Sequence, residues 1–127
     1  MDPAYLWRFF VVGYVVTIAL ETPVLLVGLS ARHSLAWRLF CGVWLTACTY
    51  PIVVLVLPLL LEPHWLYLLV AETFAPAAEC ALFWAACGTR ADWATRGMVR
   101  DFAAVTGANL LSFGVGEAVQ ALGWRLA

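Results

Sequence analysis

WLYLLVAETFAPAAECALFWAAC, residues 65–87, is long and apolar enough to cross a lipid bilayer as one helix. A transmembrane helix needs about 20 consecutive apolar residues, because each residue adds only about 1.5 Å of rise. This stretch nevertheless carries two glutamates, Glu72 and Glu79, with Pro76 between them. A charged side chain near the bilayer centre costs about 2.5–3.5 kcal/mol, so we expect both carboxyls to face other helices or water rather than lipid.

Three further apolar runs accompany this one, at residues 9–29, 39–61 and 102–123. The chain of 127 residues is 65% hydrophobic and 12% charged, a composition typical of a polytopic membrane protein. Because four spans use up nearly the whole length, we predict an all-α fold. It is a four-transmembrane-helix bundle with short loops and a single domain over residues 1–127. The formal charge of −1 argues against a nucleic-acid partner.

The arginines predict how the helices are oriented. The chain has no lysine, and most of its arginines lie in the first and third loops: Arg32, Arg38, Arg90, Arg96 and Arg100. Arg8 and Arg125 lie on the opposite side. Short loops rich in Arg stay in the cytoplasm, so both termini are expected to face outward, in a plasma or inner membrane. We interpret residues 91–101 as a solvated or interfacial lead-in to the last helix.

Four glutamates fall inside the predicted spans, and counting helical rise from the outer face sorts the polar groups into two depths. The deeper level lies about 16–21 Å from that face. It contains two carboxyls and three other polar groups: Glu21, Glu79, Asn109, Thr49 and Tyr50. The shallower level, about 8–11 Å deep, contains Glu72 and Glu117.

Helical spacing places these polar groups on shared faces. Three helices each carry one polar stripe: Tyr14, Thr17 and Glu21; Glu72 and Glu79; Asn109 and Ser112. The fourth helix also carries small residues at four-residue spacing: Ala104, Ala108, Ser112 and Gly116. A ladder of small residues is suited to close packing against another helix.

Prolines adjoin the polar groups. Pro23 follows Glu21, Pro51 follows Tyr50, and Pro76 lies within the AETFAPAAE stretch. Each proline frees a backbone carbonyl about one turn earlier in its helix. A freed carbonyl beside a carboxyl is suited to bind a cation, although prolines also produce ordinary kinks in membrane helices.

The four cysteines form two pairs at i, i+7 spacing on adjacent antiparallel helices: Cys41 with Cys48, and Cys80 with Cys87. Four thiols at matching depths would suit a soft metal such as Cu(I). Cysteine also behaves as a small apolar residue, and no C-x-x-C motif is present, so we favour a packing role. His33 and His64 lie in loops on opposite sides and are expected at the two membrane interfaces.

The leading hypothesis for function is the handling of a cation, either a proton or a divalent metal. Its central site would be Glu21, Glu79 and Asn109, with the two glutamates as candidate ligands of a bound cation. Glu72 and Glu117 would lie on the outer access route, because carboxyls at graded depth offset the cost of leaving water. Supporting polar groups would come from five further residues: Tyr14, Thr17, Thr49, Tyr50 and Ser112.

Two alternatives remain open. The polar stripes would equally suit a non-catalytic accessory or assembly subunit, in which buried carboxyls hydrogen-bond across helices inside a larger membrane complex. A membrane enzyme acting on lipid has the least support, because the spans contain no His and no hydrolase motif. Four short helices rarely enclose a pathway alone, so a homo-oligomer or a partner protein is expected. The sequence motifs assign the chain to no family.

Overall fold

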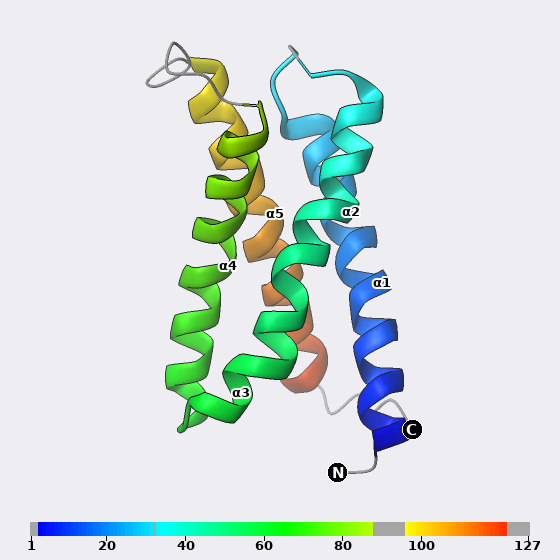
Figure 1. Cartoon of the computed structure of the whole chain (residues 1–127), viewed down its shortest axis with the longest axis vertical. Coiled ribbons are helices and arrows are strands. Elements are labelled where there is room, and N and C mark those ends of the chain that lie inside the picture. The colour runs from blue at the N-terminus through cyan, green and yellow to red at the C-terminus, as the bar shows by residue number, and fades with distance from the viewer. Residues whose placement is uncertain (1–2, 32, 88–95, 122–127) are drawn as a thin grey trace.

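The computed structural model describes residues 3–31, 33–87 and 96–121, which are almost entirely helical. The helical segments in chain order are α1 (Pro3–Gly28), α2 (Leu35–Pro51), η1 (Ile52–Val56), α3 (Leu57–Leu60), α4 (His64–Cys87) and α5 (Arg96–Ala121). α2, η1 and α3 follow one another without a break, so the chain passes four times along the bundle (Figure 1). The predicted all-α four-helix fold is confirmed.

Four segments are long and apolar enough to cross a membrane by length and composition: Phe10–Gly28, Leu35–Leu60, His64–Ala86 and Gly97–Val119. They are compatible with a multi-pass membrane protein. The start of α1 and the end of α5 lie at the same end of the bundle as α3 (Figure 1). We name this end the α3 end, and the end with the loop between α1 and α2 the Ser30 end.

Three helices begin at least four residues earlier than the sequence predicted. α1 begins at Pro3, where a proline is tolerated because the first turn needs no N–H donor. α2 begins at Leu35 rather than at residue 39. Ser34 caps its N-terminus, because the Ser34 hydroxyl accepts a 3.1 Å hydrogen bond from the Trp37 N–H. α5 begins at Arg96 rather than at residue 102. An apolar run marks the lipid-compatible part of a helix, whereas caps and polar residues extend the helix beyond it.

Pro51 changes the course of the second span. The proline has no N–H, so the carbonyl one turn earlier loses its usual donor. Ile52–Val56 form a π-helix directly after it, and the Tyr67 hydroxyl on α4 donates a 3.0 Å hydrogen bond to the Val53 carbonyl. Beyond this segment the chain bends toward the first turn of α4 (Figure 1). Pro51 and the π-helix after it therefore mark the point at which the second span changes direction.

The apolar core lies in the half of the bundle near the Ser30 end. It is built from residues of all four spans: Leu25, Leu29, Cys41, Leu45, Phe83, Ala104, Val105 and Ala108. α1 and α5 approach closely here, since a Cβ on Gly28 would lie only 2.9 Å from the Ala104 Cβ. The small-residue ladder is therefore packed from Ala104 through Ala108 to Ser112 and open at Gly116, where an added Cβ would have no neighbour within 4 Å.

Candidate functional site

A cavity of about 970 Å³ occupies the other half of the bundle, toward the α3 end. All four spans contribute to its walls. It is lined by every sequence-predicted site residue except Glu79 and Tyr14: Thr17, Glu21, Thr49, Tyr50, Glu72, Asn109, Ser112 and Glu117. Its lining includes Glu62, in the loop before α4, and Glu21, which lies one helical turn before the core residue Leu25. The cavity therefore extends from the loop before α4 to mid-bundle.

Glu21 lies at the end of this cavity nearest the apolar core and is only 4% exposed. The Ser112 hydroxyl donates a 2.6 Å hydrogen bond to one carboxyl oxygen, and the Thr46 hydroxyl donates a 2.9 Å bond to the other. Each hydroxyl also reaches a carbonyl of its own helix, at 3.1 Å on Asn109 and 3.0 Å on Gly42. A hydroxyl has one proton, so each can bond either the Glu21 carboxyl or its own backbone.

Glu79 lies behind Glu21, is 1% exposed and does not line the cavity. Its carboxyl interacts electrostatically with that of Glu21 and accepts a hydrogen bond from the Asn109 side chain. Asn109 uses another N–H to bond the Val105 carbonyl at 2.9 Å. The second oxygen of Glu79, Oε2, has no hydrogen-bond partner among the residues that the structure describes. Since an unpaired buried polar atom is costly, this oxygen is suited to hold a proton or a cation.

The structure thus brings together Glu21, Glu79 and Asn109, the three residues that the sequence placed at the centre of the site. The hydroxyl beside them comes from Thr46, one turn earlier than the predicted Thr49. Depth had been counted along a straight helix ending at residue 61. The π-helix and the lean of the second span reduce the rise along the bundle, so the deep level falls on an earlier residue.

Thr49 and Tyr50, the two α2 residues predicted at the deep level, make other contacts. Thr49 is buried and donates to the Leu45 carbonyl at 3.2 Å. Tyr50 belongs to an aromatic group with Phe10 and Tyr14, with ring centroids 5.2 and 5.6 Å away. Tyr14 itself donates to the Val43 carbonyl at 3.4 Å, which turns it toward α2 rather than into the cavity.

Glu117 and Glu72 lie nearer to the mouth of the cavity. Glu117 is paired with His64 at 3.9 Å, with the His64 side chain 65% exposed. Glu72 lines the same cavity but is exposed within its span. The predicted shallow level therefore exists as two separate carboxyls along one cavity, with Glu117 joined to a histidine rather than to Glu72.

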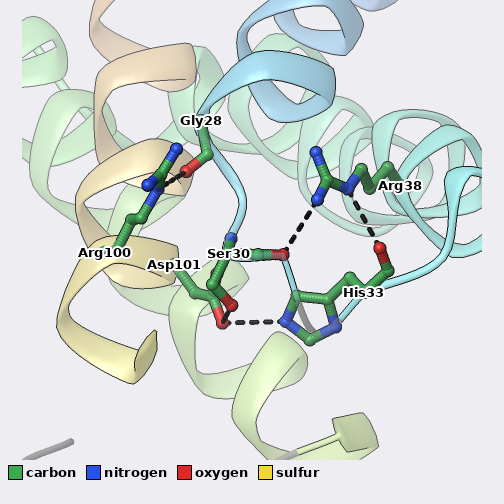
Figure 2. Close-up of polar contacts among 6 residues, drawn as sticks. All are labelled: Gly28, Ser30, His33, Arg38, Arg100 and Asp101. Carbon is green, nitrogen blue, oxygen red and sulfur yellow. Dashed lines mark hydrogen bonds and ion pairs between the residues drawn. The ribbon is translucent and has the colours of Figure 1, made fainter. Parts of the chain in front are cut away.

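The sequence interpretation missed a second buried polar cluster, at the Ser30 end (Figure 2). Asp101 had been assigned to a solvated or interfacial lead-in, but it is 0% exposed. Its carboxylate accepts a 2.6 Å bond from the Ser30 N–H, a 3.1 Å bond from the Ser30 hydroxyl and a 2.8 Å contact with the His33 ring. The His33 ring also packs on that of Phe83, with centroids 5.2 Å apart, so His33 belongs to this buried cluster.

Two arginines close the same end. Arg38 donates to the carbonyls of Leu26 and Ser30, and Arg100 donates to those of Val27 and Gly28. These carbonyls lie at or just after the C-terminus of α1, where a guanidinium satisfies unpaired acceptors and the negative end of the helix dipole. Figure 2 shows the bonds to Gly28 and Ser30. Both arginines had been used only as evidence of orientation. The available signal was the short loop after α1, which offers that helix end few other donors.

Cys41, Cys48 and Cys80, the cysteines whose side chains the structure describes, are not grouped into a metal site. Cys41 is buried in the core, and Cys80 faces α5, 3.8 Å from both the Phe102 carbonyl and the Thr106 hydroxyl. The Cys87 side chain lies outside the described part of the structure. Across the described ranges, no three His, Cys, Asp or Glu side chains are grouped so as to hold a metal ion.

Comparisons with protein-family models, with curated proteins and with solved structures found no match to this chain.

Proposed function

We propose that this protein binds and moves a cation, with a proton as the simplest one, through the cavity and onto Glu21 and Glu79. The observation that carries the proposal is the position of Glu21. It lies at the end of the cavity nearest the apolar core, and it interacts with Glu79, one carboxyl oxygen of which has no hydrogen-bond partner among the described residues.

The hydroxyls around Glu21 suit a carboxyl that changes its charge. When Glu21 is ionised, Thr46 and Ser112 can both donate to it. When Glu21 holds a proton, either hydroxyl can turn to its backbone carbonyl and accept that proton's hydrogen bond. Both states are therefore satisfied without moving a helix. Such a site can gain and lose a proton rapidly.

The remaining carboxyls supply an approach from the α3 end. Glu117 is five residues beyond Ser112 on α5, which places it about 7.5 Å nearer to that end. Glu72 precedes Glu79 by seven residues, or about 10.5 Å. A cation leaving water would thus meet a shallow carboxyl before the deep pair, and each step offsets part of the cost of desolvation.

The orientation and assembly belong to the same proposal. The arginine-rich loops favour placing the Ser30 end in the cytoplasm of a plasma or inner membrane, so the cavity would open outward. The apolar core and the Asp101 cluster close the other end in this conformation. Passage would require that end to open, and a homo-oligomer could supply the motion or complete the walls.

The experiment is proton flux into vesicles containing the purified protein, driven by a pH gradient with a potassium diffusion potential. Wild type is expected to acidify or alkalinise the lumen faster than empty vesicles. Glu79→Gln and Glu21→Gln should each lower the rate at least tenfold, because an amide cannot carry the proton. Thr73→Val is the matched control, since Thr73 is exposed and bonds only its own helix at Leu69. Equal flux in wild type and Glu79→Gln would overturn the proposal.

A second candidate, an accessory subunit of a larger membrane complex, is favoured by Glu72. This carboxyl is exposed within a span, where a partner helix could bond it. The candidate predicts a stoichiometric partner after purification in mild detergent, lost in Glu72→Leu. Flux from the purified chain alone would count against it.

A further inference from the structure

The cavity is much larger than a proton requires. Since a water molecule takes about 30 Å³ of liquid, a volume near 970 Å³ corresponds to roughly thirty waters. Sites for organic ligands span about 300–1,000 Å³. A chain of a few ordered waters would serve proton movement in a far narrower passage. The volume lies within the range of sites that hold organic ligands.

The walls favour an apolar body for that occupant. Between the carboxyls, the cavity surface consists largely of aliphatic side chains from all four spans, together with the rings of Tyr50, Tyr67 and Phe113. Water gains little from such walls, whereas an apolar group is transferred favourably onto them. Aromatic faces additionally attract a cation that lies within about 6 Å of the ring.

The charges favour a cation over an anion. Glu21 lies at the end nearest the apolar core, and Glu72 and Glu117 line the cavity nearer to its mouth. No Lys or Arg belongs to this lining within the described ranges, and His64 is the single side chain there able to become positive. A negative ligand would meet Glu21 and Glu72 with no lysine or arginine in the lining to offset their charge, at a large electrostatic cost.

We propose that the cavity binds an amphipathic organic cation, an amine or onium ion with an apolar or aromatic body. Its charge lies at Glu21 and its body lies against Tyr50, Tyr67 and Phe113. The inference rests on the proposed function, because the same Glu21 carboxyl takes either a proton or the organic cation. Binding a permanent cation displaces one proton from a protonated Glu21, so charge is conserved in the exchange.

The test compares tetraphenylphosphonium with tetraphenylborate, two ions of nearly equal size and opposite charge. Binding is measured by equilibrium dialysis against the full chain in nanodiscs of zwitterionic lipid, with empty nanodiscs subtracted. We expect saturable binding of the phosphonium, no saturable binding of the borate, and proton release on phosphonium binding in weak buffer. Glu21→Gln should weaken the phosphonium at least tenfold and abolish proton release, whereas Thr73→Val should bind like wild type.

Equal uptake of both ions, or phosphonium binding unchanged in Glu21→Gln, would overturn this inference and indicate a cavity filled by lipid chains. If Glu21→Gln fails to fold, Phe113→Ala provides the second variant, with an expected several-fold loss of phosphonium affinity. Proton flux in phosphonium-free vesicles separates the two proposals. Flux that depends on Glu79 without phosphonium binding overturns only the inference, and saturable Glu21-dependent binding without flux supports it while overturning transport.

Discussion

Asp101 at the Ser30 end and Glu21 at mid-bundle are both buried carboxyls, yet their surroundings differ in kind. Asp101 is held by a backbone N–H, a hydroxyl and a histidine ring, and arginines tie down the neighbouring helix end. Glu21 has two hydroxyl partners that each have an alternative acceptor, and it faces a cavity. A backbone N–H cannot turn away, whereas a hydroxyl can. Asp101 therefore suits a fixed structural role, whereas Glu21 suits the exchange of a proton or another cation.

The strongest way to break this comparison is Asp101→Ala. The substitution leaves the Ser30 N–H and the His33 ring without their shared acceptor in a buried site. Each buried donor left without its acceptor costs about 1–3 kcal/mol. We expect a large drop in Tm of the detergent-solubilised protein. Glu21→Gln should change Tm far less while abolishing flux, and a comparable Tm loss in both variants would contradict the distinction.

Packing gives a second comparison of the two ends. Gly28→Ala places a Cβ 2.9 Å from the Ala104 Cβ, so the closely packed end must shift, at a cost of about 1–3 kcal/mol. Gly116→Ala is the matched substitution near the α3 end, where nothing lies within 4 Å. It should be neutral or stabilising by up to about 1 kcal/mol, because alanine is the better helix former. Thermal unfolding of both variants measures the difference.

The sequence predicted the half of the bundle that holds the cavity better than it predicted the Ser30 end. Intramembrane glutamates stand out against apolar neighbours, and helical spacing put Glu21, Glu79 and Asn109 at one depth, where the structure has them adjacent. Asp101 and the arginines lie in polar surroundings, where a buried group looks like a solvated one. Their burial depends on how the loop after α1 folds back onto α5, which spacing along a single helix does not encode.

The prediction of Thr49 instead of Thr46 beside Glu21 was wrong for a different reason. Spacing identified the correct face of α2, since these residues are three apart and neighbours on a helix. The level was wrong because a π-helix cannot be read from hydropathy, and its widened turn shifts every residue before it relative to the membrane.

A comparison of Thr46 with Thr73 tests whether the hydroxyl beside Glu21 matters for function. Both donate to the carbonyl four residues earlier, but only Thr46 also reaches a carboxyl. A hydrogen bond to a charged group contributes about 1.5–3 kcal/mol, so Thr46→Val should slow proton flux by about tenfold or more. Thr73→Val should leave flux within twofold of wild type. Equal rates in the two variants would show that the Glu21 carboxyl does not depend on its hydroxyl partner.

The smallest expected effect concerns the π-helix that shapes the cavity wall. The Tyr67 hydroxyl donates a 3.0 Å bond to the carbonyl of Val53, which lies in the π-helix. Tyr67→Phe removes this bond and keeps the ring, so the free energy of unfolding should fall by about 0.5–1.5 kcal/mol. Tyr14→Phe is the matched control, because its bond to Val43 is longer, at 3.4 Å, and weaker. If Tyr14→Phe lowers Tm as much as Tyr67→Phe does, the π-helix does not depend on this bond, and the shape of the cavity must be fixed by Pro51 and packing alone.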